Sequence, residues 1–163
     1  MRLSAPGVNV RDLTAELYDL RYVDLAPMGQ RGEAKMSMEL QLLVCAVALT
    51  VIQMLVSVVG ATQQVGLPTL AANREGLAEI TGWAGRAARA HRNMLENLVL
   101  FAALVLVAHV AGKENAMTVL GSQLFIWGRA AFAVIYVIGL PWIRTAAWGV
   151  SMAGLVLIFL QVI

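Results

Sequence analysis

The residues best suited to chemistry are concentrated in residues 85–97, which read GRAARAHRNMLEN. If this segment is a helix with about 100° per residue, several polar side chains share one face. That face presents Arg86, Arg89, Asn93 and Glu96, with Arg92 at its edge. Guanidinium groups bind carboxylates bidentately, so the face suits a multiply charged anionic small molecule. The alternative is a set of arginine anchors that reach the lipid headgroups, but anchoring does not require the carboxylate one turn deeper.

A second charged residue, Arg129, lies inside the apolar run 119–140. An arginine at the bilayer centre costs about 2.5–3.5 kcal/mol on insertion scales, so it should face the protein interior and have a partner. Glu96 is the acidic residue at comparable depth on a neighbouring run. We therefore expect a buried Arg129–Glu96 pair, which either holds two helices together or belongs to a site. Tyr136 follows Arg129 at i+7 and shares its face.

Four apolar runs have to position these residues. The chain of 163 residues is 60% hydrophobic and 13% charged, with a mean hydropathy of +0.74. About 20 residues of helix cross the hydrocarbon of a bilayer. We expect helices at about 38–61, 90–111, 118–140 and 146–163, which predicts an all-α membrane protein with a four-transmembrane-helix bundle in residues 36–163. No basic block indicates a nucleic-acid partner, and no metal-ligand spacing is present.

Basic residues predict the orientation of the bundle. They lie in the first connection (Arg74, Arg86, Arg89, Arg92) and the third (Arg144), whereas the second carries Lys113. The positive-inside rule places connections one and three in the cytoplasm. Helix two then starts, and helix three ends, on the cytoplasmic side. Polar residues that are distant in sequence should therefore share one leaflet and form one pocket, which gathers Arg89, Asn93, Glu96, Tyr136 and Arg144.

Residues 1–35 differ from the rest of the chain. They contain basic and acidic residues in equal number and lack the apolar stretch of a signal peptide. We expect either a weakly ordered tail or an extension of the gene model, with translation starting at Met36 or Met38.

The string Arg89-Ala90-His91-Arg92-Asn93-Met94-Leu95-Glu96 resembles the signature of the MAPEG family, the membrane-associated proteins of eicosanoid and glutathione metabolism. Its first part is most similar to the microsomal prostaglandin E synthase branch, and the chain as a whole resembles a bacterial-type member. The Gly128-Arg129 pair with Tyr136 is similar to the family's third helix. Departures are Val99 for a frequent proline, Phe132 for a tyrosine or histidine, and Gln63-Gln64 for a basic residue. The spacing from Tyr136 to Arg144 also differs by one residue from the nearest branch. The resemblance covers about residues 36–163.

The resemblance implies a homotrimer that binds glutathione between subunits near the cytoplasmic side, with glutathione as co-substrate and no metal. The glutathione-binding residues it implies are Arg86, Arg89, Arg92, Asn93, Glu96, Arg129 and Tyr136. Arg144, followed by Thr145, resembles the arginine that activates the glutathione thiol. A nearby cation lowers the pKa of a thiol and raises its thiolate fraction.

The expected function is that of a membrane glutathione transferase or peroxidase acting on small lipophilic electrophiles that arrive through the bilayer. The alternative is a non-catalytic membrane scaffold or binding protein in which the arginine and glutamate cluster is structural. In either case we expect an integral, multi-pass membrane protein, in the inner membrane if the source is bacterial.

Overall fold

A computed structural model of the protein describes residues 36–73 and 76–163, so the predicted tail at 1–35 lies outside the described residues. The helices are α2 (Met38–Val65), α3 (Leu67–Ala71), α4 (Gly82–Val110), α5 (Ala116–Ile138) and α6 (Pro141–Val162). Four of them, α2, α4, α5 and α6, are long and apolar enough to cross a membrane. The predicted all-α membrane fold with four spanning helices is therefore confirmed.

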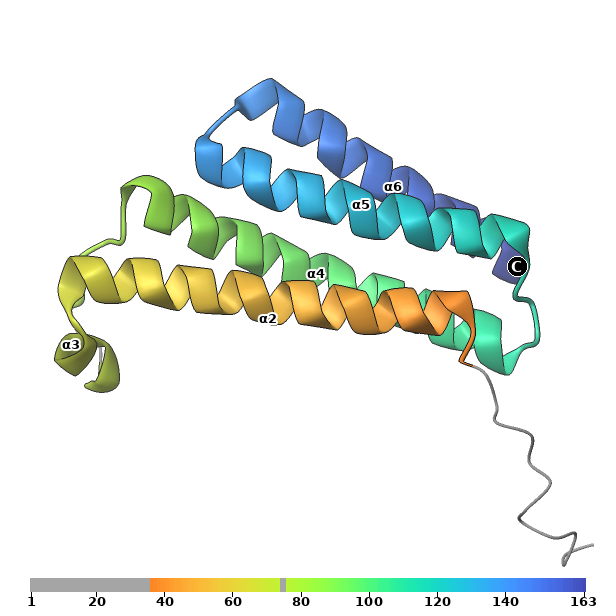
Figure 1. Ribbon diagram of the computed structural model, residues 1–163, viewed down its shortest axis with the longest axis horizontal. Helices are drawn as coiled ribbons and strands as arrows, with labels where there is room; N and C mark the ends of the chain where they lie inside the picture. The colour runs from red at the N-terminus through yellow and green to blue at the C-terminus, as the bar shows by residue number, and fades with distance from the viewer. Residues whose placement is uncertain (1–35, 74–75) are drawn as a thin grey trace, which may run out of the picture. The chain divides into compact units, whose positions relative to one another are not determined.

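The spanning helices form two antiparallel hairpins, in which α2 lies beside α4 and α5 lies beside α6 (Figure 1). The last turns of α2 and α5 therefore share one end of the bundle with the first turns of α4 and α6. We call this the arginine end, because it carries Arg86, Arg89, Arg92 and Arg144. The opposite end, where α2 and α5 begin, is called the closed end. The second span therefore begins, and the third span ends, at the arginine end.

Much of the predicted first connection is helical. The first span continues to Val65, and α4 begins at Gly82 instead of near residue 90. A helix of 29 residues is about 43 Å long, so the first turns of α4 extend beyond about 30 Å of hydrocarbon. The amide of Gln64 donates to the Thr81 carbonyl at 3.0 Å and accepts from the Thr81 N–H at 3.1 Å. This pair joins the end of α2 to the start of α4.

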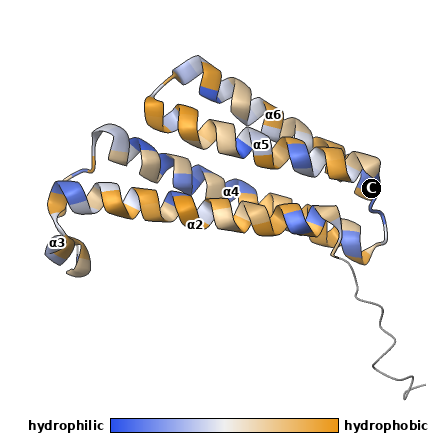
Figure 2. Cartoon of the chain, viewed as in Figure 1, coloured by the Kyte–Doolittle hydropathy of each residue, from blue (hydrophilic) through white to orange (hydrophobic). Residues whose placement is uncertain are grey.

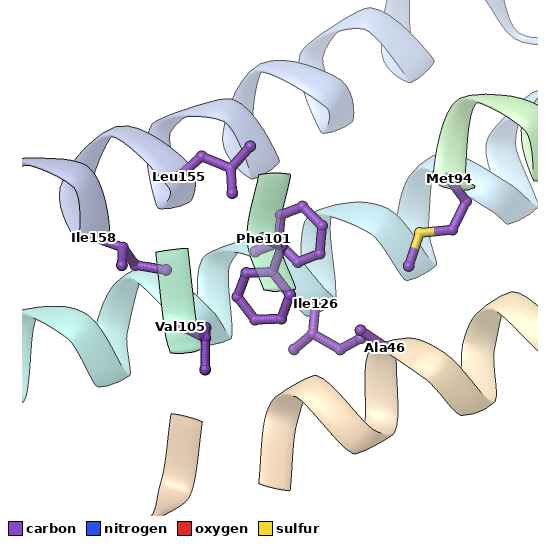
Figure 3. Close-up of a cluster of buried hydrophobic side chains, with 8 residues drawn as sticks. Ala46, Met94, Phe101, Val105, Ile126, Leu155 and Ile158 are labelled. Atoms are coloured by element: carbon purple, nitrogen blue, oxygen red, sulfur yellow. The ribbon is translucent and has the colours of Figure 1, made fainter. Parts of the chain in front are cut away.

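The core lies where the two hairpins meet (Figure 3). Phe101 of α4 and Phe125 of α5 stack with ring centroids 4.1 Å apart, and both are fully buried. The α5 and α6 backbones approach closely because a Cβ on Gly121 or Gly154 would collide with the carbonyl of the other. Small residues allow this approach between membrane helices.

Hydrophobic residues predominate along the four spanning helices (Figure 2). Large hydrophobic side chains are exposed along the spanning helices, including Ile52, Val99, Trp127 and Val156. An apolar surface of this kind is suited to contact with lipid. Helices can cross the bilayer because they satisfy their own backbone hydrogen bonds. The chain is an integral, multi-pass membrane protein.

Candidate functional site

Arg129 of α5 is the centre of the candidate site. Its side chain is 1% exposed, and its Nη2 donates to Asn93 Oδ1 of α4 at 2.8 Å. Its Nε donates to Met94 Sδ at 3.5 Å. Its Nη1 is buried and has no hydrogen-bond partner among the described residues. One nitrogen of a buried guanidinium group therefore lacks an acceptor within the described part of the chain.

The expected Arg129–Glu96 ion pair is not formed within the chain. Glu96 is exposed and contributes to the electrostatic environment of Arg129 without a direct contact among the residues that the structure describes. Asn93 replaces it as the partner. Asn93 and Glu96 are three residues apart on α4, so they differ by about 60° in direction. That rotation places Asn93 toward α5 and Glu96 toward the outer surface.

Two aromatic rings lie between two guanidinium groups in the direction from Arg129 toward the arginine end. The Arg129 guanidinium lies 4.7 Å from the centroid of the Phe132 ring. The rings of Phe132 and Tyr136 are 5.2 Å apart, and the Arg144 guanidinium of α6 lies 4.4 Å from the Tyr136 centroid. We call these four residues the cation–aromatic row. The row connects Arg144, through two α5 rings, to the buried Arg129 and Asn93.

Arg86 joins α4 to the end of α5. Its Nε donates to the Val137 carbonyl at 2.9 Å. Carbonyls in the last turn of a helix have no partner within that helix, so the side chain satisfies one of them. Gly139 follows with φ 95, which turns the chain toward α6. Arg86 thus holds helices together, and its predicted contact with glutathione stays a prediction.

The remaining predicted residues lie at the surface of the chain. Arg89, Arg92 and Glu96 are exposed, and none has a hydrogen bond or ion pair to another described residue. Thr145 is also exposed, and its hydroxyl donates to the Pro141 carbonyl of its own helix at 3.1 Å. No hydrogen bond or ion pair joins these four side chains to the cation–aromatic row within the described residues. They are free to meet a ligand or another subunit.

Two buried side chains, Phe132 and Gln53, were not singled out from the sequence as candidate functional residues. Phe132 follows Arg129 at i+3 on the same face and departs from the family pattern, and its ring lies between Arg129 and Tyr136. Gln53, an amide within the first apolar run, is buried. The available signal was its type, because an amide inside a membrane span requires a partner.

The site contains acidic, amide and guanidinium groups and no candidate metal centre. Within residues 36–73 and 76–163, no cluster of histidine, cysteine and acidic residues could hold a metal ion. The arrangement is suited to binding an anion through guanidinium and amide donors. Arg144 at the row's outer end could also stabilise a developing anion.

Comparison with known proteins identifies the family of the chain. The MAPEG family model matches residues 40–163, which include the cation–aromatic row and all of α4, α5 and α6. No curated protein and no solved structure matches the sequence significantly. Because the match covers well over half of the sequence, the chain belongs to the MAPEG family.

Proposed function

We propose that the protein binds glutathione at the arginine end and acts as a glutathione transferase on lipophilic electrophiles. The observation that carries the proposal is the buried Arg129, whose Nη1 has no partner among the described residues. An ionised side chain inside a membrane span is retained where it meets a partner or a substrate. Glutathione supplies carboxylate and amide acceptors, and membership of the MAPEG family is consistent with glutathione-related chemistry.

In this proposal the buried and exposed groups hold different parts of glutathione. Arg129 and Asn93 bind acceptors at the inner end of the site, and Tyr136 lines it. Arg89, with Arg92 beside it, binds a carboxylate at the rim. Glu96 meets the ammonium group of the γ-glutamyl residue. Arg86 acts on the site through its hydrogen bond to α5.

Arg144 is the proposed activator of the thiol. A guanidinium group close to the sulfur lowers the thiol pKa, so more thiolate is present at neutral pH. The thiolate attacks an electrophilic carbon and forms a C–S bond, while the leaving group departs with its electron pair. In the peroxidase variant, the thiolate attacks a hydroperoxide oxygen, the O–O bond breaks, and the alkoxide takes a proton and leaves as the alcohol. The sulfenic acid formed on the first glutathione then reacts with the thiol of a second glutathione, which yields the disulfide and water. Thr145 would assist only if its hydroxyl turned away from Pro141.

A homotrimer would complete the site. Arg89, Arg92 and Glu96 are exposed on a membrane-spanning helix, where an uncovered carboxylate is costly. A neighbouring subunit that packs on this face of α4 would cover them and enclose glutathione. The electrophile would enter from the bilayer. We further propose that the arginine end faces the cytoplasm, in keeping with its basic residues.

A thermal-shift titration with glutathione in mild detergent tests the proposal. Glutathione at millimolar concentration should raise the melting temperature, Arg89→Ala should remove the shift, and Arg89→Lys should retain part of it because the charge remains. Conjugation of a model aryl halide should depend on Arg144. If glutathione leaves melting and tryptophan fluorescence unchanged, the protein does not bind it.

The second candidate is a non-catalytic membrane scaffold. It is favoured by the bonds that Arg86 and Arg129 make within the chain, which connect α4 with α5. It predicts that Asn93→Ala lowers the melting temperature while the unmodified protein conjugates no electrophile. Turnover that disappears in Arg144→Ala would argue against this candidate.

A further inference from the structure

Arg86 of α4 contacts the segment that joins α5 to α6. Its Nε donates to the Val137 carbonyl in the last turn of α5 at 2.9 Å. A Cβ on Gly139 would lie 3.3 Å from the same nitrogen, so the Arg86 side chain packs directly on the glycine that ends α5. Arg86 therefore holds both the final turn of α5 and the turn that follows it.

The position of Arg144 depends on the same short segment. Arg144 lies in the first turn of α6, and its N–H donates to the Leu140 carbonyl at 3.2 Å. Its guanidinium lies 4.4 Å from the centroid of the Tyr136 ring, and Tyr136 directly precedes Val137. Two features support the Arg144 side chain, the Tyr136 ring and the turn between α5 and α6. They flank the carbonyl that Arg86 binds.

Arg86 joins the two hairpins of the bundle beside Arg144. It comes from α4, which pairs with α2, whereas α5 and α6 form the other hairpin. Within the described residues, the other side-chain hydrogen bonds between α4 and α5 run from Arg129 to Asn93 and Met94, about two helical turns deeper. Removal of the Arg86 bond therefore frees the end of α5 and the following turn, while the deeper bonds remain.

We propose that Arg86 is a positioning residue for Arg144, because it fixes the end of α5 and the following turn and thereby the place of the Arg144 guanidinium relative to a bound thiol. This inference rests on the proposed function for the thiol, whereas the position of Arg144 follows from the chain alone. Arg86 itself does not touch the sulfur. A displacement of about 1 Å can lower a rate by about 100-fold, so loss of the Arg86 bond affects turnover more than glutathione binding.

Two substitutions of similar length separate the hydrogen bond of Arg86 from its charge. Arg86→Gln places an amide nitrogen where arginine has Nε, so it keeps a donor for the Val137 carbonyl without the charge. Arg86→Met keeps neither. With a model aryl halide, we expect kcat to fall by about 10- to 100-fold in Arg86→Met and to be largely retained in Arg86→Gln. The KM for glutathione should be the same in both variants, and the ultraviolet absorbance of bound thiolate should fall only in Arg86→Met.

NMR of arginine side chains measures the position of Arg144 without glutathione. The ring current of Tyr136 shifts the Arg144 Nε–H signal, which Arg144→Lys identifies. We expect this shift to decrease in Arg86→Met and to persist in Arg86→Gln. Gln64→Met is the matched control, because it removes the bonds to Thr81 that join α2 to α4 at the same end. It should lower the melting temperature without moving the Arg144 signal or kcat.

An Arg144 signal or a kcat that is unchanged in Arg86→Met would overturn the inference. Equal losses of kcat in Arg86→Met and Arg86→Gln would also overturn it, because they would assign the effect to the charge. A higher KM with kcat retained would instead make Arg86 a direct glutathione contact. If the unmodified protein neither binds nor conjugates glutathione, the proposed function fails, and the NMR comparison still decides whether Arg86 positions Arg144.

Discussion

The two ends of the bundle differ in whether their polar side chains have partners within the chain. At the closed end, side chains from different helices satisfy one another. The Ser37 hydroxyl donates to Glu114 at 2.6 Å, and His109 lies 3.1 Å from the same carboxylate. The Thr118 hydroxyl donates to the buried Glu39 at 2.6 Å. At the arginine end, Arg89, Arg92 and Glu96 have no partner among the described residues.

The buried atoms that lack partners show the same division. Within the described residues they belong to Gln53, His91 and Arg129, and none belongs to the side chains that pair at the closed end. Buried polar groups in native proteins are normally paired, so each exception requires an explanation. The closed end is explained by architecture alone. The half of the bundle toward the arginine end has unpaired donors and acceptors, which a ligand or a neighbouring subunit could bind.

Among these substitutions, Arg129→Met should have the largest effect, because it changes the arginine end and leaves the closed end intact. It removes charge-assisted hydrogen bonds worth about 1.5–3 kcal/mol, so the apparent affinity for glutathione should fall by about 10- to 100-fold. The melting temperature without glutathione should hold or rise, because a buried charge with an unpaired donor is replaced by an apolar group. Isothermal titration and thermal unfolding in the same detergent measure the two effects.

Arg86→Met is the matched substitution for Arg129→Met. It leaves the Val137 carbonyl without its partner, so it should lower thermal stability while changing glutathione affinity less than Arg129→Met does. If both variants lose stability equally and neither changes glutathione binding, the arginine end is as architectural as the closed end.

Thr118→Val should have the next largest effect and act on stability alone. It leaves the carboxylate of Glu39, which is 3% exposed, without its hydroxyl donor, and it removes the acceptor for the Asn115 N–H. We expect a loss of about 1–3 kcal/mol in unfolding free energy. Thr62→Val is the control, because that hydroxyl is bonded to the Val58 carbonyl of its own helix. A reduced response to glutathione in Thr118→Val would contradict the division between the two ends.

Membrane spans and the inward direction of Arg129 could be predicted from sequence, because hydrocarbon imposes both length and charge placement. The start of α4 could not be predicted from the sequence. Its first turns extend beyond the hydrocarbon, so their polar composition is typical of a connection rather than of a span. The partner of Arg129 was predicted wrongly, because opposite charge favours Glu96. The rotation of α4 instead turns Asn93 toward α5, where it accepts a hydrogen bond from Arg129.

The closed end was also not anticipated from the sequence. Ser37 and Asn115 are ordinary helix-capping residues, and each does cap a helix. Their additional contacts depend on distant elements: Ser37 bonds Glu114, and Asn115 bonds Gln161 near the end of α6. Local patterns predict caps, whereas pairing across the bundle depends on how the hairpins pack.

Glu114 provides the smallest and most specific test of the closed end. The hydrogen bond from Ser37, assisted by His109 and opposed by burial, holds the pKa of its carboxyl below the ordinary value of 4.5. A lowered folded-state pKa means that this stabilisation is complete above about pH 4.5 and is lost as the pH falls through the folded-state value. In thermal unfolding from about pH 7 to about pH 3, the stability difference between the unmodified protein and Ser37→Ala should therefore shrink in acid.

Loss of the Ser37 cap on α2 is independent of pH, so it shifts the whole curve without changing its shape. His109→Gln separates the contribution of the imidazole. A difference that stays constant across the range would assign Ser37 to helix capping alone and remove Glu114 from the contacts that stabilise the closed end.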